Sequence, residues 1–465
     1  MTHKIVKNFS LVFFAQIVIL LVSVVRAIVL PKFLSVESFG YWSIYWFYTS
    51  YTAMFCLGYN DGLYLNYGGY EFRQLPIKLI RSANKLFVWG LASIASIACV
   101  LTGLLFKDKP EAFLCIFIFL NIPTVCLTGV FTHIFQITNK FKDYAFYSTI
   151  DKILVLLVII LLIFSKNANY KYIVVADFVG RLIVLLIMAY KLRLLLIGET
   201  EPLSESSAFL WDNMQDGIKL MIANLMGMLL IGGGRIIVQM LGNITDFALY
   251  SFGFSITGLI LTAVSAVSLV LYPSIKKFPS ERYPSLFVDV NAFTRLVGIC
   301  SLLLYFPCFI FLEWFYPNYS AILPFLNLFF LIVYANIKIS VLTNTFFNVL
   351  RKENTMLISN LICVLIFLVI GIIAYSFISE IWIIALCTFI ALAIRCFSAE
   401  IYLARLMNIG LSKSMITELS YLGLFAISSC CFSLGKAFVI MSIGFIVWNV
   451  MNIDATRWLI KKIRN

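Results

Sequence analysis

Residues 355–376 read TMLISNLICVLIFLVIGIIAYS, and none of their side chains is charged. A helix needs about 20 apolar residues to cross the hydrocarbon core of a bilayer, so this stretch is long enough to span a membrane. Its uninterrupted apolar character argues against an outer-membrane barrel, in whose strands polar and apolar residues alternate. The stretch therefore predicts a transmembrane helix.

The whole chain shares this character. Of its 465 residues, 62% are hydrophobic and only 12% are charged, and the mean hydropathy is +0.99. Soluble globular proteins contain about 45–50% apolar and about 25% charged residues. Because unpaired backbone groups are costly in hydrocarbon, long apolar runs of this kind form helices there. We expect an all-α polytopic membrane protein.

The apolar runs predict about fourteen transmembrane helices. The first run is too long for a signal peptide and lacks a small-residue cleavage site, so we expect it to remain as a span. The predicted spans are 9–30, 39–59, 83–106, 112–137, 148–165, 170–190, 214–241, 246–272, 293–313, 321–348, 355–376, 381–404, 415–434 and 437–454.

The basic residues predict the orientation. With the N-terminus inside, 21 of the 35 Lys and Arg residues fall in inner loops and tails, and six fall in outer loops. Basic residues are enriched on the cytoplasmic side of membrane proteins. We therefore expect a multi-pass protein of a bacterial inner membrane with both termini in the cytoplasm. The same distribution explains the net charge of +13 without a nucleic-acid partner.

Several kinds of site are not indicated. The eleven cysteines form no C-x-x-C pair, and most lie in apolar runs, as small buried hydrophobes do. His3 and His133 make no metal constellation, and no G-x-x-x-x-G-K-[ST] phosphate loop occurs. The sequence therefore predicts no metal and no cofactor. Outer loops of only a few residues also argue against a membrane enzyme such as a polysaccharide polymerase or ligase.

The two halves of the chain look like copies of one another. The pairs Arg26 and Arg235, Phe135 and Phe347, and Arg181 and Arg395 are separated by 209, 212 and 214 residues. Six helices per copy give both copies one orientation in the membrane, which is a parallel repeat. Such repeats are typical of transporters whose lobes rock around a substrate near the midplane.

A polar, acidic stretch separates the copies. It contains Pro202 and the acids Glu199, Glu201, Glu205 and Asp212. We therefore expect an N-terminal six-helix lobe over 1–198, an acidic cytoplasmic linker over 199–215 and a C-terminal six-helix lobe over 216–410. A terminal helix pair with a basic tail then occupies 411–465.

Several short stretches resemble a known family. They are Arg26–Pro31, Glu37-Ser38-Phe39-Gly40, Leu57-Gly58-Tyr59-Asn60-Asp61-Gly62 and Tyr67-Gly68-Gly69, with Leu249-Tyr250-Ser251 and Leu271-Tyr272-Pro273 in the second copy. On these residues the chain resembles the polysaccharide transporter branch of the multidrug/oligosaccharidyl-lipid/polysaccharide exporter superfamily, the O-antigen and capsule repeat-unit flippases.

The resemblance implies a V-shaped bundle of two lobes and a lipid-linked cargo. The cargo would be an undecaprenyl-pyrophosphate-linked oligosaccharide repeat unit, moved from the cytoplasmic to the outer leaflet by alternating access, with no ATPase domain. Its partners would include the lipid bilayer, a polysaccharide polymerase and a chain-length regulator. One departure stands out, because Gly232-Gly233-Gly234 precede Arg235 where many relatives carry an acid.

Ionisable residues inside the predicted spans are candidates for the site, because a charge in hydrocarbon is costly. Asp177 is the one acid placed well inside a span. The basic ones are Arg26, Lys152, Arg181, Lys219, Arg235, Arg295, Lys338 and Arg395. A cationic interior suits an anionic cargo such as a pyrophosphate, which arginine can hold with two parallel hydrogen bonds.

Each charged candidate also has a structural interpretation. Arg26 and Arg235 lie about one turn from the outer interface and can extend toward water, so anchoring and cargo binding stay equally open. Asp177 and Arg181 are spaced i, i+4 and can simply neutralise each other.

Two basic residues lie deepest in the predicted spans. Lys338 and Arg395 have no partner at helical spacing, and we expect them to face a cavity. By contrast, Lys152, Lys219 and Arg295 lie near inner ends, where they are better explained as interface anchors.

A polar stripe lies on the predicted helix 321–348. Asn336, Ser340 and Asn344 are four residues apart, so they either line a sugar path or bond neighbouring helices. Lys338 lies about 200° around that helix from Asn336. The predicted substrate-binding residues are thus Arg26, Asp177, Arg181, Arg235, Asn336, Lys338, Asn344 and Arg395.

Gly232, Gly233 and Gly234 are adjacent in the predicted helix 214–241. Glycine in a helix costs about 1 kcal/mol relative to alanine, so three together favour a bend. They predict a hinge for alternating access, with close helix packing as the alternative.

Two other transport functions remain open. A multidrug cation exporter of the same superfamily would need acidic residues inside the membrane. The predicted spans contain one such acid, Asp177, and several basic residues. A peptidoglycan-precursor lipid flippase is compatible with fourteen helices.

Overall fold

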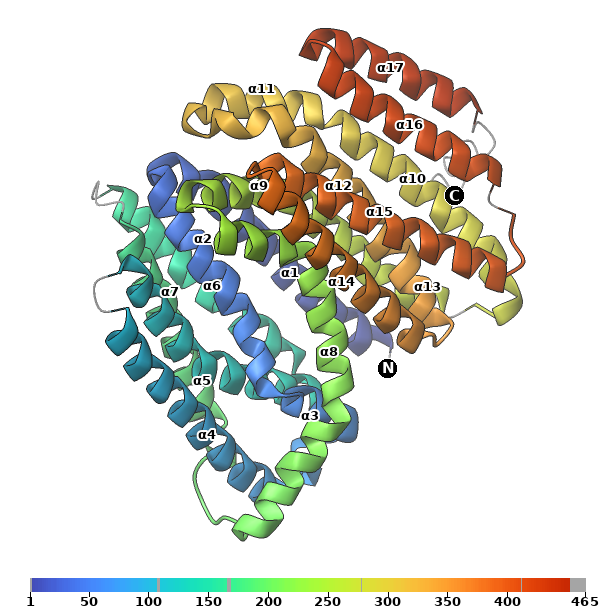
Figure 1. Ribbon diagram of the computed structural model, residues 1–465. Coiled ribbons are helices and arrows are strands. Elements are labelled where there is room, and N and C mark those ends of the chain that lie inside the picture. Colours follow the sequence, from blue (N-terminus) through green and yellow to red (C-terminus); the bar gives the residue numbers. More distant parts are fainter. Residues whose placement is uncertain (1, 107–108, 165–168, 277, 411, 452–465) are drawn as a thin grey trace. The chain divides into compact units, whose positions relative to one another are not determined.

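The computed structural model describes residues 2–106, 109–164, 169–276, 278–410 and 412–451, and all regular elements in these ranges are helical (Figure 1). The chain divides into two compact units, Met1–Leu225 and Met226–Asn465. The predicted all-α polytopic architecture is confirmed.

In the first unit the helices gather around α5. The unit consists of α1 (Thr2–Phe33), α2 (Val36–Tyr51), α3 (Tyr59–Tyr67), α4 (Ile77–Leu105), α5 (Pro110–Ile137), α6 (Phe141–Phe164), α7 (Tyr170–Lys191) and the first part of α8 (Leu203–Leu241). Helix α5 packs against α2, α3, α4, α6 and α7, while α1 packs against α6. Residues 203–215 of the predicted linker are helical and belong to α8.

In the second unit the central element is α12. The unit holds the rest of α8, α9 (Ile244–Ile275), α10 (Tyr283–Leu303), α11 (Tyr305–Phe315), α12 (Leu326–Lys338), α13 (Asn344–Val349), α14 (Glu353–Phe377), α15 (Ile381–Leu406), α16 (Ser412–Cys431) and α17 (Leu434–Met451). The most apolar part of Pro317–Val349, which contains α12, is 83% buried, compared with 28% for α14. Helices α9, α10, α15 and α16 pack against α12.

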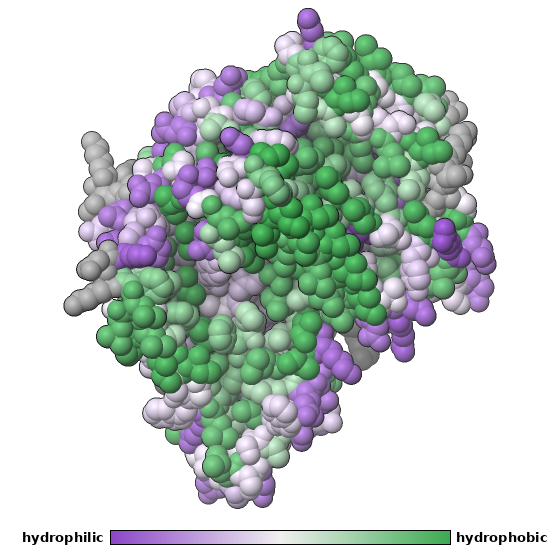
Figure 2. Space-filling model, viewed as in Figure 1, coloured by the Kyte–Doolittle hydropathy of each residue, from purple (hydrophilic) through white to green (hydrophobic). Residues whose placement is uncertain are grey.

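The outward faces of both units are apolar. Leu365 and Val369 on α14, and Ile97 and Leu104 on α4, are all more than half exposed. Figure 2 shows a continuous hydrophobic surface over α14. Exposing apolar faces of this extent to water is unfavourable, whereas hydrocarbon solvates them. These are therefore the lipid-facing surfaces.

Twelve of the fourteen predicted spans have counterparts. The described residues contain eleven helices long and apolar enough to cross a membrane, or twelve when the two parts of α8, bent by 63° at residue 230, are taken together. The remaining predictions are 9–30 and 39–59. Helix α1 covers 9–30, although the side chains of residues 2–16 lie outside the described part.

The prediction of one continuous helix over 39–59 is wrong. Helix α2 ends at Tyr51, and a 3₁₀ turn over Thr52–Cys56 follows. Leu57 and Gly58 then adopt left-handed backbone conformations, with φ of 49° and 82°. Residues in this conformation end a right-handed helix, so α3 starts afresh at Tyr59.

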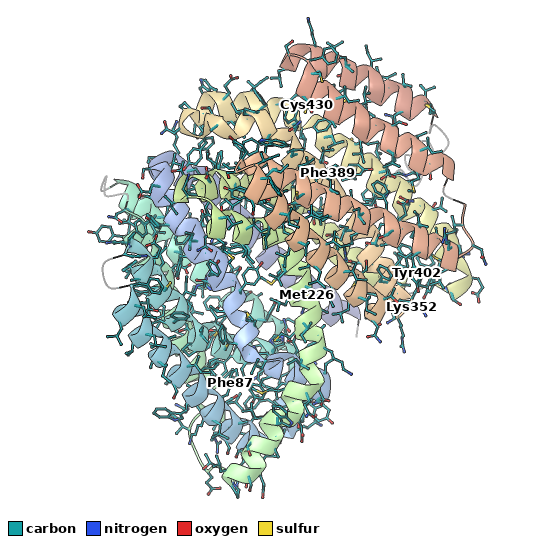
Figure 3. All side chains as sticks on the ribbon, viewed as in Figure 1. Phe87, Met226, Lys352, Phe389, Tyr402 and Cys430 are labelled. Atoms are coloured by element: carbon teal, nitrogen blue, oxygen red, sulfur yellow. The ribbon has the colours of Figure 1, made fainter. Side chains whose placement is uncertain are left out.

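Glycines allow α3 to lie directly against α8. A Cβ atom at Gly62 would lie 1.8 Å from the carbonyl oxygen of Asn213, and one at Gly217 would lie 2.0 Å from that of Gly58. The ring centroid of Tyr59 lies 5.1 Å from that of Phe87 on α4. Figure 3 labels the Phe87 side chain. The backbones of α3 and α8 can approach this closely only without side chains at the contact.

Gly62→Ala should destabilise the protein by about 1–3 kcal/mol, because the added methyl group overpacks the α3–α8 contact. Denaturant titration of the helical circular dichroism signal in detergent measures the effect. Gly90→Ala on α4 is the matched control, since a Cβ there meets no atom within 4 Å. Equal stability of the two variants would contradict the packing argument.

Candidate functional site

Three cations of the first unit meet in one place. Arg26 from α1, Lys152 from α6 and Arg181 from α7 line a small cavity together with Trp46 and Asp177. Its volume is about 10 Å³, which is room for about one water molecule. Three cations and one carboxylate thus line the cavity, and we call this group the cationic cluster.

The indole ring of Trp46 lies between the two arginines. The Cζ atom of Arg26 lies 3.5 Å from the ring centroid, and that of Arg181 lies 5.5 Å from it. A guanidinium over an indole face is attracted by the ring's quadrupole, by about 2 kcal/mol when desolvated. Trp46 therefore holds two like charges in proximity without neutralising them.

Asp177 fixes the position of Arg181. Its Oδ2 accepts a hydrogen bond from Arg181 Nε at 2.8 Å and another from the Tyr45 hydroxyl at 2.7 Å. The Asn121 amide donates to the Tyr45 oxygen at 3.0 Å. The Asp177 side chain is 3% exposed and that of Arg181 is 20% exposed. The carboxylate is thus fully enclosed, while the guanidinium reaches an opening.

That opening is a second cavity of about 170 Å³. Lys152 and Arg181 line both cavities. The other polar lining residues of the larger one are Thr124, Thr128, Thr132, Tyr147 and Ser148. Hydroxyl groups and cations around one cavity can together bind an anion that carries several acceptor oxygens.

Lys338 in the second unit has partners that local spacing did not reveal. Its Nζ lies 2.6 Å from Glu400 Oε2 and forms a second ion pair with Glu418. All three side chains are 1% exposed. Lys338 thus has no partner in its own helix, as predicted, but it pairs with two acids on other helices. Both acids lie near the ends of their helices and are nevertheless buried. A cargo role for Lys338 stays a prediction.

Arg395 also has partners. Its Nη2 donates to Asn344 Oδ1 at 2.9 Å, and its Nε donates to Asn360. The arginine is only 3% exposed, whereas Arg181, its match in the predicted repeat, borders a cavity. Arg395 thus has no partner in its own helix, as predicted, but amides of two other elements bind it. A cargo role for Arg395 stays a prediction.

The remaining predicted residues lie in the second unit. The Arg235 guanidinium lies 4.6 Å from the ring centroid of Phe254. Asn336 donates to the carbonyl of Ile332 in its own helix. A π-helical turn over Ile339–Thr343 separates Asn336 from Asn344, so the predicted regular stripe is interrupted. A role of these residues in cargo binding remains a prediction.

The glycine triplet lies in a tightly packed part of α8. A Cβ atom at Gly234 would lie 2.2 Å from the hydroxyl oxygen of Tyr250, which is hydrogen-bonded to Thr388. A Cβ atom at Gly233 would lie 3.0 Å from the Phe367 ring. This packing supports the alternative explanation of the triplet, and the hinge, including Gly232, stays a prediction.

Sequence reasoning underrated several members of the cationic cluster. Lys152 was expected to be an interface anchor. Trp46, Tyr45 and Asn121 were not among the predicted site residues. The signal that could have identified them is the presence of polar side chains inside apolar spans, because such side chains form hydrogen bonds across helices.

The fold matches solved transporters. The structure titled lipid II flippase MurJ, inward closed conformation, superposes with a TM-score of 0.67 at 14% identity, covering 98% of this chain and 100% of that one. An inward-facing multidrug resistance MATE family transporter of the MOP superfamily gives 0.55 at 12% identity, covering 84% and 99%. The Vibrio cholerae MATE transporter VcmN in the bent form gives 0.51 at 14% identity, covering 87% and 97%.

These similarities establish the fold shared by the transporters of that superfamily. No family model matches the sequence, and no curated protein matches it.

Tyr45→Phe should lower the free energy of unfolding by about 1.5–3 kcal/mol, because the enclosed Asp177 carboxylate loses a hydrogen-bond donor. Chemical denaturation in detergent measures the loss. Tyr64→Phe, on the exposed side of α3, is the control and should change stability little. Similar stability of both variants would show that the Tyr45–Asp177 bond contributes nothing.

Proposed function

We propose that this protein is a flippase for undecaprenyl-pyrophosphate-linked oligosaccharide repeat units of O-antigen or capsule. It moves them from the cytoplasmic to the outer leaflet by alternating access. The observation that carries the proposal is the cationic cluster of Arg26, Lys152 and Arg181 beside a hydroxyl-lined cavity. The other support is the shared fold, which the solved neighbours use for transport, and none of those named is an enzyme.

A pyrophosphate suits the cations of the cluster. Three cations and one carboxylate line the small cavity. A pyrophosphate brings negative charge and several acceptor oxygens. Arginine binds such groups with a planar pair of donors, and lysine adds a point charge. The three basic side chains can thus bind the pyrophosphate together.

The hydroxyl-lined cavity is suited to the first sugar. Thr124, Thr128 and Ser148 offer hydroxyls that can both donate and accept, which is what sugar hydroxyls require. The cavity of about 170 Å³ is far too small for an oligosaccharide. We infer that it receives the region around the pyrophosphate, while the rest of the glycan and the polyprenyl tail lie elsewhere.

A second candidate is a peptidoglycan-precursor lipid flippase. The favouring observation is the match to the lipid II flippase over the full length of both chains. A multidrug cation exporter fits less well, because the cationic cluster would repel a cationic drug and Asp177 is already occupied by Arg181 and Tyr45.

The setting follows from the proposed function. We infer a bacterial inner membrane, cytoplasmic termini, and a polysaccharide polymerase and chain-length regulator as partners that receive the translocated repeat unit. An anionic cargo and basic cytoplasmic loops already explain the positive net charge of the chain. We therefore propose no nucleic-acid partner.

Removing charge from the cluster should weaken cargo binding. We expect Arg26→Gln and Arg181→Gln each to reduce the affinity for undecaprenyl pyrophosphate in nanodiscs by about 10- to 100-fold, the range for a hydrogen bond between charged partners. The fluorescence of Trp46 reports binding. The Trp46→Phe variant lacks this signal and shows what the other tryptophans contribute. Lys142→Gln, on an exposed position of α6, is the control. Unchanged affinity in both arginine variants would refute the cluster as the pyrophosphate site.

Complementation separates the two candidate cargoes. The wild-type gene should restore surface polysaccharide to a strain that lacks its own repeat-unit flippase, and Arg181→Gln at equal protein level should not. Rescue only of a strain depleted of its peptidoglycan-precursor flippase would instead favour the second candidate.

A further inference from the structure

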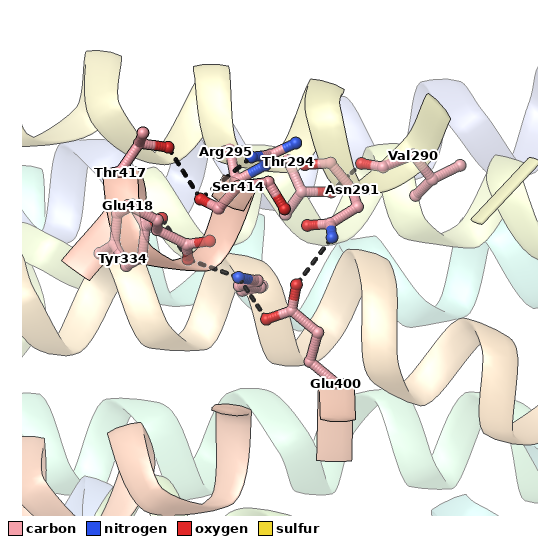
Figure 4. Close-up of polar contacts among 10 residues, drawn as sticks. Val290, Asn291, Thr294, Arg295, Tyr334, Glu400, Ser414, Thr417 and Glu418 are labelled. Atoms are coloured by element: carbon pink, nitrogen blue, oxygen red, sulfur yellow. Dashed lines mark hydrogen bonds and ion pairs between the residues drawn. The ribbon is translucent and has the colours of Figure 1, made fainter. Parts of the chain in front are cut away.

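A buried cluster of three charges lies in the second unit, apart from the proposed cargo site. Lys338 of α12 contacts Glu400 of α15 and Glu418 of α16 (Figure 4). All three side chains are 1% exposed. Two carboxylates around one ammonium leave the triad with a net charge of −1. Burying an uncompensated charge is costly, so the triad needs one more positive charge.

The hydrogen bonds around the triad contain too few donors. Asn291 donates to Glu400 Oε1 at 2.7 Å, and the Tyr334 hydroxyl donates to Glu418 Oε1 at 2.6 Å. Glu418 Oε2 and Asn291 Oδ1 are buried, yet accept no hydrogen bond from any described residue. Glu400 Oε2 has only its ion-pair contact with Lys338. Buried polar atoms are normally satisfied, so this excess of acceptors indicates a missing proton.

Arg295 and Arg395 are also buried in this unit and keep their own charges, but neither pairs with the carboxylates of the triad. Arg295 of α10 directs its guanidinium to the carbonyl oxygens of Asn291 and Ser414, at 3.4 and 3.3 Å. Arg395 of α15 is held by two asparagines. Tyr334 donates to Glu418, and its phenol, like the thiol of Cys396 one turn before Glu400, is neutral at pH 7. Among the described residues, only Lys338 forms an ion pair with either carboxylate.

A metal ion is a poor candidate for the missing charge. The Lys338 ammonium already contacts both carboxylates, where a metal would have to bind, and it would repel the metal. No group of three or more His, Cys, Asp or Glu residues suited to a metal occurs in the described ranges. A proton needs no such space, since it binds directly to one carboxylate oxygen.

We propose that Glu400, Lys338 and Glu418 form a proton-binding site. A hydronium ion gives its proton to a carboxylate oxygen, with Glu418 Oε2 the best placed, which yields a carboxylic acid and water. Loss of that proton to water restores the carboxylate. Glu418 lies six residues from the start of α16, about 9 Å along the helix axis, so this is the nearer end of the helix.

Proton binding changes how α16 is held. With the proton on Glu418, the Lys338 charge is balanced by Glu400 alone. The contact between α12 and α16 is then no longer an ion pair, and the Lys338 ammonium and the Tyr334 hydroxyl donate to an uncharged acid. Helix α16 belongs to the predicted terminal pair outside the two six-helix copies. Protonation of the site therefore weakens the attachment of this pair to α12, and the site does not depend on which cargo is moved.

Infrared spectroscopy of the purified full-length protein tests the site. The wild type should show the carbonyl stretch of a protonated carboxylic acid at neutral pH, shifted by ¹³C-glutamate labelling. Glu418→Gln and Glu400→Gln should each abolish this band, because either change leaves one carboxylate paired with one ammonium. Lys338→Met should strengthen it, because both carboxylates then need protons.

Glu313→Gln, on an exposed position of α11, is the control and should leave the band unchanged. A band that persists in both Glu400→Gln and Glu418→Gln, or that is absent from the wild type, overturns the proposal. These spectra are recorded without cargo, so their outcome is separate from that of the flippase assays. Should Lys338→Met fail to fold, the two glutamine variants, which keep the side-chain shape, still decide the question.

Discussion

Hydrocarbon supplies no hydrogen bonds, so each charge that enters it must find its partners inside the protein. Backbone groups satisfy this demand within single helices, and side chains satisfy it across helices. The Tyr45 hydroxyl reaches Asp177 across 132 residues of sequence, and Lys338 reaches Glu418 across 80. Because breaking such buried contacts leaves a charge unpaired, they specify which helices lie together more strictly than apolar contact does.

The two units meet this demand differently at the positions that the sequence repeat pairs. Arg181 forms an ion pair with Asp177, stays 20% exposed and borders a cavity. Arg395 is 3% exposed and is enclosed by the amides of Asn344 and Asn360. A side chain can bind a large cargo only if the cargo can reach it. This difference supports our proposal of a cargo site in the first unit, although the sequence analysis favoured Arg395 over Arg181.

Local sequence patterns predicted what is local in the structure. The length of a membrane span depends only on the residues of its own apolar run, so α4 and α14 were predicted well. The i, i+4 pair of Asp177 and Arg181 was found for the same reason. The predictions failed where contacts with a distant part of the chain determine the local structure. The break at Leu57 and Gly58 allows α3 to contact α8, and the partners of Lys338 lie on other helices. No spacing rule within one helix can reveal either.

Charge imbalance is informative here because water is absent. At an aqueous surface, charges of this kind would be screened and would identify no ligand. In a low-dielectric interior they act more strongly on a ligand of opposite sign. The lining of the cavity around Arg26 and Arg181 is rich in cations, which is why we propose an anionic cargo there. Two carboxylates surround Lys338, which is why we propose a proton there. The two proposed ligands have opposite charges, so one protein can hold both without competition between them.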